Sequence, residues 1–429
     1  PIILINLIIC DYYSTKIEQN ITPKSSINAT LNSNEETPKF TVIGLENRND
    51  VQYIGNIYVG IPHKKMSVIF DTGSNILWLP SINCSICRGN SMRYNPNEST
   101  TSVNLNKEQD ISFAVGFVKG YLYTDTVSLN HNNFHELFNK EISVNDLRML
   151  SVKEEANLTV TFSDGVLGLG INNEGNSKNS LIETLYNQNK ISSPSFSFYL
   201  LSTNNISRLY IGNILNNEYM LKLVENKIQS VYFPNSKEFW SCESKNGIST
   251  FDKNKLNKIN FNTNSSFIFD TGSSYTFIPE SDLKIILINL GIEQNCIFGQ
   301  DMQLICKCQT IREYGYVEIE FDANNKFILD LEKMIDYKVR NNYQCEFQIQ
   351  VNNYDENIWI LGDSALRGNL LSYDINERKV SFIQNISGII DDTNIAKAKE
   401  NQSNWLTSKI FWIILAVIIL LISYLIVIY

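Results

Sequence analysis

A segment of twelve residues occurs twice in this chain and constrains its fold more than any other feature. Residues 69–80 read IFDTGSNILWLP and residues 268–279 read IFDTGSSYTFIP, with seven identical positions. The aspartates of the two copies, Asp71 and Asp270, are 199 residues apart. This period is too long for one unit of a solenoid, which spans roughly 20–50 residues. The repeat therefore predicts two similar lobes within one chain.

A shorter pattern follows each copy of this motif. The segment DGVLGLG follows the first copy and places Gly168 97 residues after Asp71. The segment IWILGDS follows the second copy and places Gly362 92 residues after Asp270. Because the order and the spacing both recur, we expect the two lobes to share the same internal arrangement.

Most of the chain has the pattern of β-strands. Helical patterns are few: residues 180–189, and residues 281–291, where Ser281 is expected to cap the helix and Gly291 to end it. Short or alternating apolar runs rich in β-branched and aromatic residues lie between clusters of Asn, Gly and Ser. The fold class is therefore predicted to be all-β, with two related β lobes and a few short helices. The predicted strands include residues 53–60, 65–71, 110–118 and 317–321.

Length and composition agree with two globular lobes. A chain of 429 residues is long for a single core, and its hydrophobic fraction of 43% and charged fraction of 19% are those of a folded protein. The formal charge of −9 and the lack of a basic cluster exclude a nucleic-acid-binding surface. We expect no nucleic-acid partner.

The N-terminal residues are expected to direct the protein into the secretory pathway. Residues 1–10 contain the apolar run IILINLIIC, which has the length of the hydrophobic part of a signal peptide and is too short to span a membrane. The chain opens on a proline, so the beginning of this signal peptide is expected upstream. Residues 11–48 are polar and rich in Asn and Ser, which predicts a propeptide or an N-terminal arm. Asn-x-Ser/Thr acceptors recur along the chain and permit glycosylation.

The C-terminal residues predict a membrane anchor. Residues 410–429 contain no charged side chain and are long enough for a transmembrane helix, which needs about 20 apolar residues. Residues 385–409 would then be a polar stalk. The alternative is a lipid-anchor signal, with Ala396 and Ala398 as the small residues at the attachment site and residues 399–409 as the spacer. Either anchor leaves the two lobes on the lumenal or extracellular side.

The repeated aspartates predict a catalytic pair. A single Asp-Thr-Gly is usually a β-turn, but two copies preceded by Ile-Phe and followed by Ser do not fit that explanation. Two carboxyl groups at close range cannot both ionise, so they share one proton. The ionised member acts as a general base on a water molecule, and the protonated member polarises the scissile carbonyl. Gly73 and Gly272 are expected to let the chain turn sharply beside each carboxylate.

The hydroxyl residues of the two motifs are expected to support this pair. Thr72 and Thr271 can form hydrogen bonds across the interface between the lobes. Ser74 and Ser273 can each donate to the adjacent carboxylate and fix its orientation.

Six segments within residues 48–384 then carry a family resemblance: IGNIYVGIP, DTGSNILWLPS, DGVLGLG, RLYIGNI, DTGSSYTFIP and WILGDSALRGNLLSYDINERKVSF. In their order and spacing they resemble the pepsin-like aspartic peptidases. The resemblance implies the bilobal pepsin-like acid protease fold, with an N-terminal catalytic lobe at 49–225 and a C-terminal catalytic lobe at 226–384. It also implies a zymogen, a monomer, and a peptide or protein substrate bound between the lobes.

With its predicted membrane anchor, the chain resembles the plasmepsins of parasites within this family. By the same resemblance, Trp78 matches the tryptophan behind the flap, and Asp363 matches a structural aspartate.

The chain departs from the family pattern at the flap, the hairpin that closes over the substrate. The resemblance places Phe113 where the family usually has a tyrosine, followed by Ala114, Val115 and Gly116. The phenolic hydroxyl and any hydrogen bond from it to Trp78 are therefore missing. We expect altered subsite preference or a more mobile flap; the alternative is that the tip of the hairpin merely varies.

Cysteine and histidine residues give no indication of a metal or cofactor. Cys84 and Cys87 match a small disulfide loop of the family, and a second CxxC that would favour a zinc or redox site is absent. His131 and His135 have i,i+4 spacing, but the glutamate of a zinc peptidase helix is not between them. We expect no bound metal and no cofactor.

The second lobe contains five further cysteines. Cys308 and Cys345 resemble the disulfide bridge of the family's second lobe. Cys296 and Cys306 are then expected to form an additional pair, and Cys242 has no predicted partner.

The function predicted from these features is that of an aspartic endopeptidase. A catalytically silent pepsin-fold protein that binds a partner is the alternative, since a fold alone does not determine function. The intact aspartates, glycines and hydroxyl residues of both motifs argue against that alternative. A structural membrane glycoprotein would explain the two ends of the chain but not the repeated motif.

Overall fold

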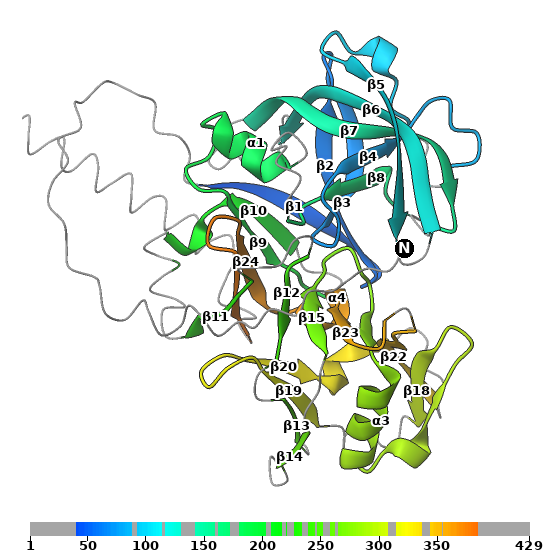
Figure 1. The fold of residues 1–429 in the computed structure, drawn as a ribbon, viewed down its shortest axis with the longest axis vertical. Helices are drawn as coiled ribbons and strands as arrows, with labels where there is room; N and C mark the ends of the chain where they lie inside the picture. Colours follow the sequence, from blue (N-terminus) through cyan, green and yellow to red (C-terminus); the bar gives the residue numbers. More distant parts are fainter. Residues whose placement is uncertain are drawn as a thin grey trace, which may run out of the picture.

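The computed structural model is mostly β-sheet with a few short helices, in two halves joined by a sheet at the middle (Figure 1). In this view the blue and cyan first half lies at the top, and the green to orange second half lies at the bottom. The structure describes residues 40–87, 92–113, 116–129, 142–158, 162–171, 180–202, 207–216, 220, 227–233, 239–244, 247–251, 258–261, 265–307, 315–336, 344–353 and 355–384.

The first half contributes one side of a large sheet that has 13 strands among the described residues. Most neighbours are antiparallel, but β3 pairs in parallel with β8, and β4 pairs in parallel with β7. The strands on this side follow the order β2 (Gln52–Val59), β3 (Lys64–Asp71), β8 (Gly165–Gly168), β4 (Leu77–Pro80), β7 (Ile142–Ala156), β6 (Gly116–Leu129) and β5 (Val103–Phe113).

The other side of this sheet takes strands from both halves of the chain. β24 pairs with β9, so residues close to the C-terminal end of the fold lie beside residues of the first half. The order on this side is β11 (Gln229–Tyr232), β25 (Lys379–Ile383), β24 (Leu370–Asp374), β9 (Ser195–Tyr199), β10 (Ser207–Gly212) and β1 (Phe40–Arg48).

Two further sheets build the second half, and β15 again pairs in parallel with the strand that follows it in space, β23. The larger sheet has the order β12 (Ser241–Glu243), β15 (Ser266–Phe269), β23 (Ile358–Leu361), β16 (Thr276–Ile278), β22 (Gln344–Val351), β18 (Gln303–Lys307) and β17 (Cys296–Phe298), with β21 (Ile335–Asp336) on β22. The smaller sheet has the order β14 (Lys258–Phe261), β13 (Ile248–Phe251), β19 (Tyr316–Glu320) and β20 (Lys326–Asp330).

The two predicted helices are present, but one begins differently than expected. α1 (Leu181–Asn187) is capped by Ser180, which accepts from the backbone of Glu183. α3 (Glu280–Asn289) begins after Pro279 and has no side-chain cap, so Ser281 lies inside the helix rather than capping it. The other short helices are α4 (Asp363–Leu366) and the 3-10 helices η2 (Pro96–Glu98), η4 (Ile214–Asn216), η6 (Glu293–Asn295) and η8 (Leu331–Met334).

Two segments take a form that the sequence pattern did not predict. Residues 40–48, predicted to be the end of the propeptide or N-terminal arm, form β1 between β10 and β2. Alternation explains this strand, because Ile43 and Leu45 are buried while Gly44 and Glu46 between and beyond them are exposed. The predicted strand at 110–118 is instead the two facing ends of β5 and β6 in a hairpin.

The predicted signal peptide, stalk and membrane anchor at residues 1–10, 385–409 and 410–429 lie outside the described residues. Among the helices that the structure describes, none combines the length and the apolar character required to cross a bilayer.

Aromatic side chains fill the junction between the two halves. The rings of Phe196 in β9 and Tyr373 in β24 are stacked, with centroids 4.8 Å apart. Trp240 from the second half packs edge-on against both rings and donates from its indole to the carbonyl of Leu169 at 3.1 Å. Such large buried rings contribute heavily to stability, so this cluster holds the shared sheet together.

Replacing Phe196 with alanine should therefore lower the free energy of unfolding by about 3–5 kcal/mol, because the substitution removes a buried ring and leaves a cavity. Urea unfolding followed by tryptophan fluorescence measures this change. The control is Ile297→Ala, at a side chain that is 58% exposed, which should change stability by less than about 0.5 kcal/mol. Similar losses for the two variants would contradict the importance of the cluster.

Candidate active site

The two predicted aspartates lie at equivalent positions in the two halves. Asp71 is the last residue of β3, and Asp270 directly follows β15. Each of these strands is paired in parallel with the strand of the shorter repeated pattern, β8 and β23. The sequence repeat is thus a structural repeat, and both aspartates leave the sheet at the carboxyl end of a central strand.

The glycines of the motifs are required by a close approach of the two loops. A methyl group on Gly73 would lie 2.6 Å from Oδ1 of Asp270, and one on Gly272 would lie 2.1 Å from Oδ1 of Asp71. Neither glycine has a backbone φ in the left-handed region. Both glycines lie in the turn that follows the strand end, as expected. The turn does not use a left-handed backbone, and the reason for glycine is that each one makes room for the carboxylate of the other half.

The threonines connect the two loops by reciprocal hydrogen bonds. The amide of Thr271 donates to Oγ1 of Thr72 at 2.9 Å, and the amide of Thr72 donates to Oγ1 of Thr271 at 3.1 Å. The hydroxyl of Thr72 donates to the carbonyl of Phe269 at 2.8 Å, and that of Thr271 to the carbonyl of Phe70 at 2.7 Å. Both threonine side chains are buried, so all four bonds are shielded from water.

The serines of the two motifs behave differently. The hydroxyl of Ser74 donates to Oδ2 of Asp71 at 2.5 Å, as expected. The hydroxyl of Ser273 instead donates to the carbonyl of Tyr275 at 2.9 Å. The expected hydrogen bond from Ser273 to Asp270 is therefore absent, because the Ser273 hydroxyl donates to the backbone carbonyl of Tyr275 instead.

The surroundings of the two carboxyl groups make their proton affinities unequal. Burial raises the pKa of Asp71, while hydrogen bonds from Ser74, Gly73 and Asp270 oppose that rise. Burial and the charge of Asp71 raise the pKa of Asp270 well above its ordinary value of 3.8. Each carboxyl group lies against the glycine of the other motif, which brings the two groups close together. The pair therefore holds a single proton, and the charge of Asp71 favours the protonated form of Asp270.

A third buried carboxyl group lies behind the second loop. The amide of Asp363 donates to the carbonyl of Ser273 at 2.7 Å, which places α4 directly against the second copy of the repeated motif. Burial raises the pKa of Asp363 well above its ordinary value; the charge of Arg367 opposes this rise, and the charges of Asp270 and Asp71 add to it. In the shorter repeated pattern, Asp363 stands where the first copy has Leu169. This difference between the two copies could have indicated the additional carboxyl group from the sequence.

Arg367 joins the second half to the turn between β1 and β2. Its Nε donates to the hydroxyl of Tyr53 at 3.0 Å, and its Nη2 donates to the carbonyl of Asp50 at 3.0 Å and to Oε1 of Gln348 at 2.9 Å. Gln348 donates to the same Asp50 carbonyl at 2.9 Å. Sequence reasoning missed this junction, because its residues are far apart in the chain and belong to no motif.

The predicted flap residue and tryptophan meet beneath the β5–β6 hairpin. The rings of Phe113 and Trp78 have centroids 6.3 Å apart and planes tilted by 51°. Gly116 opens β6 with a φ of 122°, and a methyl group there would lie 2.2 Å from the carbonyl of Ala156. The other predicted flap residues, Ala114 and Val115, lie outside the described residues.

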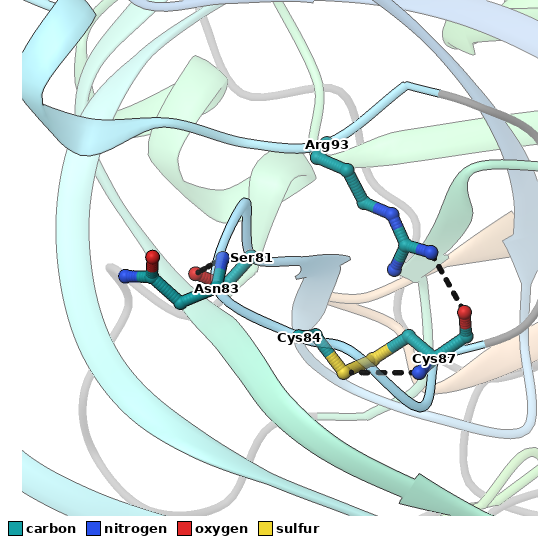
Figure 2. The surroundings of a disulfide bond; sticks show 5 residues. All are labelled: Ser81, Asn83, Cys84, Cys87 and Arg93. Carbon is teal, nitrogen blue, oxygen red and sulfur yellow. Dashed lines mark hydrogen bonds between the residues drawn. A yellow bond between two sulfur atoms is a disulfide. The ribbon is translucent and has the colours of Figure 1, made fainter.

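The small loop after the first motif contains the expected disulfide between Cys84 and Cys87 (Figure 2). The amide of Asn83 donates to Oγ of Ser81 at 3.2 Å within this loop. Arg93 reaches over the loop and donates from Nη2 to the carbonyl of Cys87 at 2.7 Å. The loop is therefore held by a covalent bond and by a charged side chain.

The cysteines of the second half agree with the predicted pairs as far as they are described. Cys296 and Cys306 form a disulfide across the directly paired strands β17 and β18. Cys345 is also disulfide-bonded, whereas its predicted partner Cys308 lies outside the described residues, so that pairing stays a prediction. The thiol of Cys242 is buried in β12 and donates to the carbonyl of Glu243 at 3.2 Å.

No three His, Cys, Asp or Glu side chains lie together as a metal site would require, within the ranges that the structure describes.

A comparison with protein families matches residues 52–385 to the model of the eukaryotic aspartyl proteases. Among curated proteins, chymosin of Callithrix jacchus is 30% identical over 186 residues, 43% of this chain and 45% of its own length. Pepsin A of Rhinolophus ferrumequinum is 34% identical over 162 residues, 37% of this chain and 39% of its own length. Rhizopuspepsin-1 of Rhizopus niveus is 30% identical over 201 residues, 46% of this chain and 49% of its own length. The chain thus spans less than half of the length of these relatives.

Replacing Thr72 with valine should lower the free energy of unfolding by about 2–5 kcal/mol, because the amide of Thr271 and the carbonyl of Phe269 would each lose a buried partner. Chemical denaturation measures the loss. Thr72→Ser keeps the hydroxyl and is the matched control. Equal destabilisation by valine and by serine would show that the methyl group, and not the hydrogen bonds, supports the junction.

The raised pKa of Asp363 predicts a stability that depends on pH. A buried carboxyl with a raised pKa binds its proton more tightly in the folded state, so its contribution is present below the unfolded pKa of about 3.8 and is lost as pH rises through the folded pKa. Unfolding measured from pH 4 to pH 7 should become easier with rising pH. Asp363→Asn should flatten this decline, and the exposed-site control Asp110→Asn should leave it unchanged. An unaltered slope in Asp363→Asn would contradict the prediction.

Proposed function

Because the chain belongs to the eukaryotic aspartyl protease family, we propose that it is an aspartic endopeptidase that uses Asp71 and Asp270 to activate a water molecule. The observation that carries the proposal is the meeting of two carboxyl groups from equivalent strand ends, each packed against the glycine of the other half's motif. Such a pair holds one proton and one negative charge, which is what hydrolysis by water requires.

The proposed assignment of roles follows from the hydrogen bonds. Asp71 receives donors from Ser74 and Gly73, which favour its ionised form. Asp270 receives the amide of Gly272 but no serine hydroxyl, and the charge of Asp71 favours its protonated form. Asp71 is therefore the general base, and Asp270 is the general acid in the pair.

Hydrolysis then proceeds without a covalent intermediate on the protein. Asp71 removes a proton from the water as its oxygen attacks the scissile carbonyl carbon, and Asp270 donates its proton to the carbonyl oxygen. When the carbon–nitrogen bond of the tetrahedral intermediate breaks, Asp71 gives its proton to the departing amine nitrogen. The proton of the hydroxyl that becomes a carbonyl again returns to Asp270, which restores the starting state.

The proposed substrate is a peptide or protein segment bound in extended form between the two halves. The β5–β6 hairpin with Phe113 at its end would close over the segment and exclude water from the reacting bond. We propose that the chain acts as a monomer, since both aspartates come from one chain.

The proposed location is the secretory pathway, with the protein anchored in a membrane. The disulfides Cys84–Cys87 and Cys296–Cys306 support an oxidising compartment. The finer proposal of an anchor rests on the uncharged residues 410–429.

Asp71→Asn and Asp270→Asn should each lower kcat/KM for peptide hydrolysis by at least about 100-fold, because the pair then lacks its base or its acid. Cleavage of a peptide mixture, read by mass spectrometry, measures the loss. Asp110→Asn, whose side chain is 60% exposed on the hairpin, is the control and should retain activity. Activity that persists in either dyad variant would overturn the mechanism, and a folded but inactive native chain would favour a silent binding protein.

A further inference from the structure

Trp78 lies on the side of its strand that faces the hairpin. Alternation along β4 places Leu77 and Leu79 in the main core, whereas Trp78 belongs to a separate cluster with residues of β6 and β7. This cluster, here called the hairpin cluster, consists of Ile54, Ile69, Ile76, Trp78, Cys84, Cys87, Val118, Leu122, Leu150, Val152 and Val166, with Ile111, Phe113, Leu158 and Phe162 partly buried against it.

The indole N–H of Trp78 has no hydrogen-bond partner in the described part of the chain, although the side chain is 2% exposed. The other members of the hairpin cluster are aliphatic, aromatic or disulfide-bonded cysteine, so none offers a carbonyl or hydroxyl oxygen from its side chain. Nearly all buried donors in folded proteins have an acceptor, and a buried donor without one lowers the stability of the fold. This exception therefore requires an explanation.

The partly buried members of the hairpin cluster show from which direction an acceptor can reach the indole. Phe113 pairs with Gly116 at the end of the hairpin, and its ring lies next to Trp78. The other partly buried members are Ile111, Leu158 and Phe162, and the rest of the hairpin cluster is buried. Since the ring of Phe113 contacts Trp78 at the end of the hairpin, an acceptor from a bound peptide would reach the indole there by displacing that ring.

We propose that Trp78 is a specificity-determining residue whose indole N–H donates to an acceptor oxygen on a side chain of the bound peptide. The preferred peptides carry an amide or hydroxyl side chain, such as Asn or Thr, where an apolar isostere would leave the donor unsatisfied. Phe113 makes this selectivity possible because it brings an aromatic ring without an oxygen. This inference rests on the proposed function, because it concerns the peptide bound at the same site.

The test compares pairs of peptides of nearly equal shape, Asn against Leu and Thr against Val, placed in turn at each position around the cleaved bond. For each position, we take the ratio of kcat/KM for the acceptor-bearing peptide to kcat/KM for its apolar partner. For the wild-type chain, we expect one position at which this ratio is about tenfold higher than at the other positions. Trp78→Phe removes the donor, and Phe113→Tyr supplies an internal acceptor. Both variants should abolish the preference.

Phe162→Leu is the matched control, since it alters packing in the same hairpin cluster but leaves the donor in place. It should keep the preference even if overall activity falls. A wild-type chain with no preferred position, or a preference that survives in Trp78→Phe or in Phe113→Tyr, would overturn the inference.

Failure of the proposed function gives a different result. If the wild-type chain cleaves none of the peptides, the same pairs are compared by their Kd in isothermal titration. A tenfold difference in Kd that disappears in both variants supports the role of Trp78 in a binding protein. Equal Kd values for the paired peptides, or no binding of either member, reject that role.

Discussion

Four buried hydrogen bonds between Thr72 and Thr271 and the opposite strand ends determine the geometry of the site. Each threonine uses both its amide and its hydroxyl, so the loops can meet in only one register. Gly73 and Gly272 then allow each loop to approach the carboxylate of the other half. The distance between the aspartates therefore follows from contacts that involve no charge, which lets the protein hold two carboxyl groups together despite their repulsion.

Equivalent backbones carry unequal electrostatics. Ser74 reaches Asp71, whereas Ser273 bonds to a carbonyl of its own loop. Asp363 adds a further buried carboxyl group on the side of Asp270. A duplicated fold thus positions two like groups, and small differences in their neighbours give them different protonation states. The same burial that separates these states makes the folded protein less stable as pH rises.

Much of the fold and of the site could be predicted from the duplicated motif. Strands, the two longer helices and the junction threonines followed from local pattern and from the repeat. Arg367 and Tyr53 could not be predicted, because their hydrogen bond joins residues 314 positions apart and has no local signature. The shared sheet was missed for a similar reason: which edge strands pair depends on packing across the junction, where Phe196 stacks on Tyr373.

The sequence by itself determined that two aspartates recur in matched lobes, since the identity of the residues and their spacing are properties of the sequence. It also indicated the missing oxygen at Phe113. Only the tertiary structure decided that Ser273 turns away from its carboxylate and that, within the part of the chain that the structure describes, the indole of Trp78 is buried without an acceptor. These outcomes depend on which groups lie within hydrogen-bond distance in the folded chain, and that distance is set by the packing of segments far apart in sequence.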